Sequence, residues 1–115
     1  MITTSRALYL GIALALAACG SKSPTAPTKP TAASPADPKL AKIYDQTCKA
    51  CHSNPASGAP LAGDAKAWTP RTAQGMDVLM QHAINGYKGM PPLGSCMDCS
   101  EDELRALIKF MAGAQ

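Results

Sequence analysis

Several stretches of the chain carry apolar residues at the three- and four-residue spacing of amphipathic helices. The clearest lies at the C-terminal end, where Ser100 and Glu103 have the spacing of a capping box and Gly113 marks the end of the pattern. The apolar stripe between them consists of Leu104, Leu107, Ile108 and Met111. This pattern predicts a helix from about residue 101 to residue 112.

Three further helices are predicted upstream. Asp37-Pro38 is a typical helix start, with Asp as N-cap and Pro at the first helical position, and an apolar stripe follows from Leu40 to Thr47. Thr69-Pro70 suggests a similar start for a short helix that ends near Gly75. A third stripe runs over residues 76–84 and is stopped by Asn85-Gly86.

No segment alternates with period two for long enough to predict a strand, so we expect an all-α domain. Long connections rich in glycine and proline are expected at 53–67 and 87–99. Connections of that length need something to pack against, which points to a bound cofactor.

The N-terminal 18 residues have the pattern of a secretory signal: Met1–Arg6 carries one cation, and Ala7–Ala18 is an apolar run of twelve residues, too short to span a bilayer. The following Leu16-Ala17-Ala18-Cys19 resembles the bacterial lipobox, in which the cysteine becomes lipidated. We therefore expect a signal peptide at 1–18 and a lipid anchor at Cys19. The alternative is an ordinary signal cleaved near Ala18. Ser21, in place of an aspartate, slightly favours the outer membrane.

Residues 19–37 are rich in proline, alanine and hydroxyl side chains and have no apolar period, so we expect a flexible linker there. In extended polyproline geometry it would lift a domain at 38–115 up to roughly 50 Å from the membrane. We expect this domain to be a monomer.

Composition and charge argue against some classes of function and favour others. The net charge is +3 with no basic run, which argues against a nucleic-acid partner. Aromatic residues make up only 4% of the chain, and a folded part below about 80 residues usually needs a metal, disulfide or cofactor for stability. Five cysteines are available for that purpose.

The strongest motif is Cys48-Lys49-Ala50-Cys51-His52, which has the pattern of a c-type haem attachment site. Two cysteines on one helical turn can each form a thioether to haem, and His52 can then ligate the iron. Two other interpretations exist. A thiol–disulfide exchange centre would need a strand–helix context, and Cys48, Cys51, Cys96 and Cys99 could form a structural zinc site.

Met90 is the candidate for the second axial iron ligand. It lies in Gly86-Tyr87-Lys88-Gly89-Met90-Pro91-Pro92, a loop in which prolines restrict the backbone and no helical stripe needs filling. Met76, Met80 and Met111 lie on apolar stripes and are expected in the core, and His82 is expected to be structural or exposed. Methionine–histidine ligation suits an electron carrier.

With these landmarks in order, residues 39–112 resemble the class I c-type cytochromes, specifically the small bacterial cytochrome c-five type. The resemblance rests on Ile43–Thr47 before the haem motif, Gly58-Ala59-Pro60 after it, Ala67–Arg71, Met90-Pro91-Pro92, and the pair Cys96 and Cys99. It implies a small monohaem cytochrome c fold of three to five helices with one covalent haem c.

The resemblance also implies roles for individual residues. Met90 would be an axial ligand, the Pro60 carbonyl would accept the His52 ring N–H, and Cys96 and Cys99 would pair as a disulfide. Trp68 and Arg71 are candidates for contacting a haem propionate. The first and last helices would cross at Phe110, although Leu40 stands where the family usually has glycine.

These observations predict a single-electron carrier, not an enzyme, that serves redox protein partners on the periplasmic side of a membrane. Lys49 and Lys88 are candidates for steering acidic partners. Two alternatives remain: a haem sensor or small peroxidase with an open iron site, and a zinc-stapled binding module.

Overall fold

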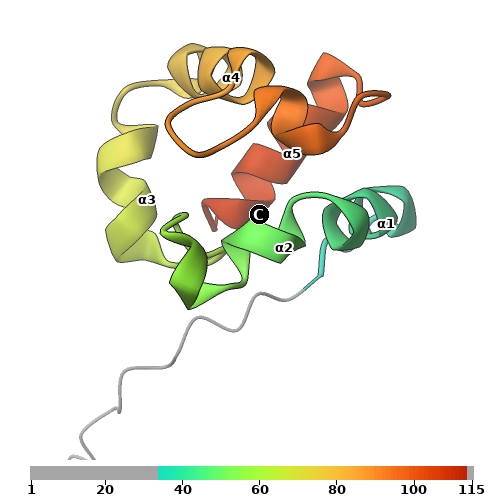
Figure 1. Ribbon diagram of the computed structural model, residues 1–115, viewed down its shortest axis with the longest axis horizontal. Coiled ribbons are helices and arrows are strands. Elements are labelled where there is room, and N and C mark those ends of the chain that lie inside the picture. Colours follow the sequence, from blue (N-terminus) through green and yellow to red (C-terminus); the bar gives the residue numbers. More distant parts are fainter. Residues whose placement is uncertain (1–33, 114–115) are drawn as a thin grey trace, which may run out of the picture.

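The computed structural model describes residues 34–113 as a domain of five helices (Figure 1). In chain order they are α1 Pro38–Gln46, α2 Lys49–His52, α3 Ala65–Thr72, α4 Met76–Asn85 and α5 Glu101–Met111, with short 3-10 turns at Pro55–Ser57 and Pro92–Ser95. Within this range no strand forms, and the expected all-helical class is confirmed. No helix in residues 34–113 has the length and apolar character needed to cross a membrane.

The ends of α1 and α5 follow the sequence signals. Asp37 caps α1, with its side chain accepting hydrogen bonds from the amides of Lys39 and Leu40. The capping box of Ser100 and Glu103 begins α5. Polar side chains placed to bind the free amides of a first turn therefore set both boundaries.

The prediction for α3 was wrong at its start. The helix begins at Ala65 and not at Thr69, because Asp64 acts as the N-cap and accepts from the amide of Ala67. Pro70 consequently lies inside the helix, where it removes one backbone donor. The helix ends two residues later, at Thr72, and the connection expected at 53–67 is correspondingly shorter.

The core is centred on α5, which packs against both α1 and α4. Tyr44 of α1 and Leu107 of α5 are the most completely buried large side chains, and the Tyr44 ring meets Phe110 edge-on at 5.0 Å. The predicted contact at Phe110 is confirmed. Leu40 is accommodated as a partly buried residue that packs against the same core.

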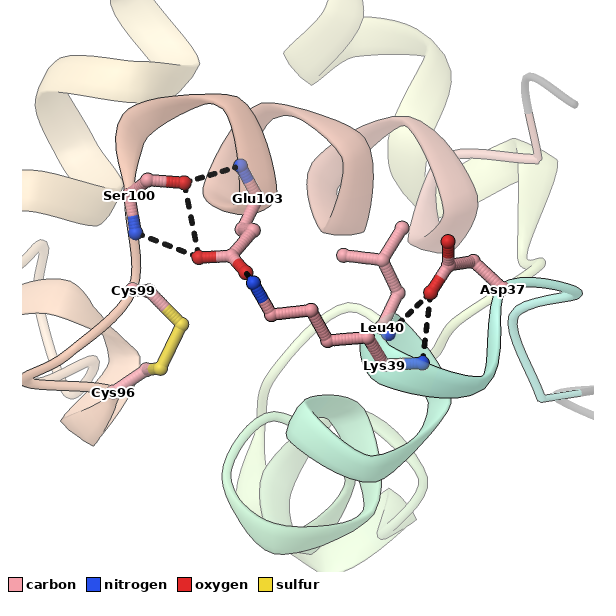
Figure 2. A network of polar contacts seen from close by, with 7 residues as sticks. All are labelled: Asp37, Lys39, Leu40, Cys96, Cys99, Ser100 and Glu103. Carbon is pink, nitrogen blue, oxygen red and sulfur yellow. Dashed lines mark hydrogen bonds and ion pairs between the residues drawn. A yellow bond between two sulfur atoms is a disulfide. The ribbon is translucent and has the colours of Figure 1, made fainter.

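A polar junction joins the first turns of α1 and α5 (Figure 2). One carboxylate oxygen of Glu103 accepts from the Ser100 amide at 2.8 Å and from its hydroxyl at 2.9 Å. The other carboxylate oxygen pairs with the Lys39 ammonium. The hydrogen bond from Lys39, followed by those from Ser100, lowers the pKa of Glu103 to about 2.

This junction makes stability depend on pH in a defined direction. The folded-state pKa of Glu103 lies below the ordinary value of 4.5, so its contribution is present above pH 4.5 and is lost as the pH falls toward about 2. A Glu103→Gln variant should be less stable than the parent at neutral pH, and the difference should shrink over this acid range. Denaturant unfolding of both proteins at several pH values measures the effect.

Asp102→Asn is the matched control, because Asp102 lies in the same first turn but forms no ion pair within the described residues. If Glu103→Gln and the parent lose stability in parallel as the pH is lowered, the proposed contribution of the junction is absent.

Candidate functional site

The Cys48–His52 motif forms a single helical turn. Cys48 is the N-cap of α2, and the amide of His52 donates to the Cys48 carbonyl at 3.0 Å. Neither cysteine is in a disulfide, and Cys48 is half-buried while Cys51 is exposed. Burial raises the pKa of the Cys48 thiol. A three-residue separation on a helix places the two thiols on the same side of the turn.

His52 is held in one orientation. Its side chain is only 7% exposed, and Nδ1 donates to the Pro60 carbonyl at 2.8 Å. Since a carbonyl can only accept, the proton lies on Nδ1 and the Nε2 lone pair is free. Burial lowers the pKa of His52, with the Pro60 contact acting in the opposite direction. The ring is thus favoured in the neutral form that can ligate a metal.

The segment after the motif folds back onto it through three successive residues. Pro60 accepts from the His52 ring, Leu61 accepts from the Trp68 indole N–H at 2.8 Å, and the Ala62 amide donates to the His52 carbonyl at 2.8 Å. These contacts fix the position of His52 relative to α3. Second-shell contacts of this kind commonly orient metal-ligating histidines.

Trp68 is buried beside His52. Its side chain is 5% exposed, its ring stacks beside that of His52 at 5.9 Å, and its indole N–H is already bonded to Leu61. These contacts place Trp68 in the core against His52, and a contact with a propionate stays a prediction. Arg71 is partly buried, donates to the Ala67 carbonyl, and has no carboxylate partner within residues 34–113.

Met90 is held by a tight backbone loop. Tyr87 and Met90 exchange two backbone hydrogen bonds, each 3.0 Å long. Gly86 enters this loop with φ of +83°, and a Cβ there would lie 3.0 Å from the Met90 carbonyl oxygen and 3.1 Å from Pro92. A side chain at position 86 is therefore excluded by both backbone conformation and space.

The methionine side chain is partly buried against the core. Gly94 lies beside its terminal methyl group: a Cβ at Gly94 would be 3.3 Å from the Met90 Cε, and the glycine has φ of +56°. Figure 1 shows α2 (green) and the segment between α4 and α5 (orange) on opposite sides of the middle of the domain. The structure thus holds the two candidate ligands on separate, independently braced segments.

A disulfide between Cys96 and Cys99 follows this segment, immediately before the N-cap Ser100 (Figure 2). It ties the end of the Met90 segment to the start of α5. The four-thiolate zinc site is contradicted, because two of its thiols are paired here. In addition, no cluster of three or more potential metal-ligating residues exists within residues 34–113.

Sequence reasoning missed two contributors to the site. Leu61 acts through its backbone carbonyl, which no side-chain motif reveals. Tyr87 stacks on His82 at 3.8 Å with an interplanar angle of 18°, a contact across the turn that ends α4. The position of Tyr87 beside Asn85-Gly86 was visible in the sequence, but its stacking partner was not.

The donor set fits a covalently bound haem. A helical turn offers two free thiols, an adjacent buried imidazole has Nε2 free, and a thioether is held on a braced loop. Neutral nitrogen and thioether sulfur are the axial ligands of electron-transfer haem proteins. The fold and the site together define a c-type cytochrome.

The comparisons with known proteins agree with this assignment to the c-type cytochromes. The model of the family described as "Cytochrome C oxidase, cbb3-type, subunit III" matches residues 35–111. Cytochrome c5 of Ectopseudomonas mendocina is 45% identical over 73 residues, covering 62% of this chain and 84% of that protein. Cytochrome c-555 of Chlorobaculum tepidum is 39% identical over 74 residues, covering 61% and 68%. The chain belongs to the cytochrome c5/c-555 family of class I monohaem c-type cytochromes.

A solved structure shows the same fold. The crystal structure of an electron transfer complex of nitrite reductase with cytochrome c contains a chain with a TM-score of 0.60 and 38% identity, covering 68% of this chain and 95% of that one. As a member of this family, the protein carries one covalent haem c and acts as an electron carrier, not as an enzyme.

Proposed function

We propose that this electron carrier works at the periplasmic face of a membrane, held there by a lipid on Cys19. There it would pass single electrons between redox proteins. The assignment of the electron-transfer site rests mainly on the orientation of His52. Its Nδ1 donates to the Pro60 carbonyl, while the lone pair of Nε2 stays free.

In this proposal each residue has a defined task. Cys48 and Cys51 hold the haem covalently, His52 and Met90 are the two axial ligands, and Pro60 orients the His52 ring. Arg71 offers its charge to a propionate. When bound, the haem supplies a one-electron ferric/ferrous couple. Ligands fixed by Pro60 on one side and by the Tyr87–Met90 loop on the other oppose rearrangement when the charge of the site changes.

A redox enzyme is the class of partner that we propose. The structural relative was crystallised in an electron transfer complex with nitrite reductase. Contacts between such partners are small and exchange rapidly. A carrier held through Cys19 could then meet a donor and an acceptor in turn.

The anchor rests on residues that lie outside the described part of the chain: the signal-like segment 1–18, Cys19 and most of the linker 19–37. Several acyl chains, at about 0.8 kcal/mol for each buried methylene, would bind the membrane firmly. A Cys19→Ser variant should therefore move from the membrane fraction to the soluble periplasmic fraction. An unchanged distribution would contradict lipidation at Cys19.

Visible absorption spectra of the protein, made with haem-maturation factors and recorded oxidised and reduced, test the electron-carrier site. Bands of covalent haem, a weak long-wavelength methionine-to-iron band in the ferric form, and no change on adding carbon monoxide are the expected result. Covalent haem without that band, or with a spectrum that shifts under carbon monoxide, would favour the open-site sensor or peroxidase.

A further inference from the structure

Tyr87 is an unusual surface residue. Its side chain is 45% exposed, and it is one of only two large hydrophobic residues exposed within residues 34–113. One ring contact is the His82 imidazole, stacked at 3.8 Å, and the Lys88 ammonium lies 5.3 Å from the ring centre. The ring is therefore held by its neighbours although much of it faces solvent. A preordered aromatic side chain loses little entropy when a partner covers it.

The same residue is coupled directly to the proposed axial ligand. The Tyr87 amide donates to the Met90 carbonyl, and the Met90 amide donates to the Tyr87 carbonyl, both at 3.0 Å. These two hydrogen bonds fix the backbone of Tyr87 relative to that of Met90. Contact with Tyr87 would bring a partner close to the segment that carries the ligand.

Charge indicates what kind of partner fits. The segment 78–97, which contains Met90, has one lysine and no carboxylate, and the segment 46–63 around the haem motif likewise has one lysine and no carboxylate. Lys49, the lysine of the second segment, is paired with Asp45 at 2.8 Å. Lys88 has no ion-pair partner within residues 34–113. It is thus the cation that the segment 78–97 offers to a partner.

Acidic residues collect directly after the Met90 segment. Four of the eight carboxylates between residues 34 and 113 lie together in positions 98–103, at the start of α5. The described domain is formally neutral, with eight basic and eight acidic side chains, so its charge asymmetry and not its net charge would orient a partner.

We propose that Tyr87 and Lys88 form the contact point for a redox protein whose docking surface is an apolar patch bordered by carboxylates. Tyr87 supplies the apolar anchor, and Lys88 supplies the charge that steers the encounter. This inference rests on the proposed function and adds the chemistry of the partner to it. It also separates the two candidate steering lysines: Lys88 takes that role and Lys49 does not.

Stopped-flow electron transfer from the reduced, haem-loaded full chain tests the proposal. The protein oxidant is a nitrite reductase, and hexaammineruthenium(III) serves as a small oxidant that needs no docking surface. Tyr87→Ala should lower the second-order rate constant with nitrite reductase about tenfold, as expected for loss of an aromatic interface anchor. Tyr87→Phe, which keeps the ring, should retain most of the rate.

Charge reversal provides the second arm. Lys88→Glu should slow transfer to nitrite reductase and weaken its decrease with added salt, because the attractive pair is lost. Lys109→Glu makes the same change at an exposed lysine of α5 that forms no ion pair with another described residue, and it should have a much smaller effect. Neither Lys88→Glu nor Lys109→Glu should slow electron transfer to hexaammineruthenium(III).

The outcomes separate this proposal from the proposed function. The docking proposal alone is overturned if the haem spectra are normal and the parent transfers electrons to nitrite reductase no faster than Tyr87→Ala and Lys88→Glu do. Equal slowing by Lys88→Glu and Lys109→Glu also overturns it, since net charge would then suffice. If the spectrum of the parent has no methionine-to-iron band, the proposed function is contradicted instead.

Discussion

A Met90→Ala variant is expected to lose the long-wavelength methionine-to-iron band, to bind carbon monoxide in the reduced form, and to show a lower midpoint potential. Met90 is the methionine that the structure holds on a braced, non-helical loop, partly buried against the core. The potential should fall by on the order of 100 mV, since axial ligands set haem potentials over a range of about 0.8 V. Absorption spectroscopy and a redox titration measure these effects.

Met97→Ala is the matched control. Met97 lies in the same segment but is 74% exposed, between the two cysteines of the disulfide. It should keep the band and the potential of the parent. If the Met90→Ala protein retains the band, Met90 is not an iron ligand. If Met97→Ala loses the band, the ligand is Met97 and the assignment to Met90 is wrong.

A variant with both Cys48 and Cys51 replaced by alanine is expected to carry no covalent haem and to fail to form a cooperatively folded domain. The thioethers depend on these two cysteines, neither of which is in a disulfide. The fold has few large buried side chains, and a domain of this size usually needs a cofactor, metal or cross-link in addition to its core to stabilise the folded state. A haem stain after denaturing electrophoresis and circular dichroism during thermal unfolding measure the two effects.

Replacing Cys96 and Cys99 together by alanine serves as the comparison. This change removes the same number of sulfur atoms but leaves the Cys48–His52 turn intact, so haem should remain attached. Haem that stays bound through denaturation in the Cys48/Cys51 variant would contradict the attachment site. A sharp unfolding transition in the haem-free protein would show that the polypeptide core suffices for folding.

The helices were predicted best where a local rule determines the boundary. The start of α5 follows from Ser100 and Glu103, because a capping box satisfies amides within one turn and needs no distant residue. The start of α3 was misplaced because Thr69-Pro70 has the pattern of a helix start, whereas Asp64 caps the helix five residues earlier. Asp64 prevails in a fold that also buries Trp68 against His52.

The site divides in the same way. The Cys48–His52 turn could be identified from spacing alone, since its chemistry depends on residues that are neighbours in the chain. The roles of Trp68 and Leu61 could not, because the indole N–H and the carbonyl that accepts it meet only when α3 folds back on the segment after the motif.

The sequence by itself determined the helical class, the attachment motif and the methionine-bearing loop, because each depends on periodicity or on the chemistry of a few consecutive residues. Only the tertiary structure decided which polar groups are already paired. It joined Lys39 to Glu103, and it stacked Tyr87 on His82 while leaving Lys88 without an ion-pair partner among residues 34–113. Pairing depends on distances of a few ångströms between side chains on different turns or elements, which spacing along the chain does not specify.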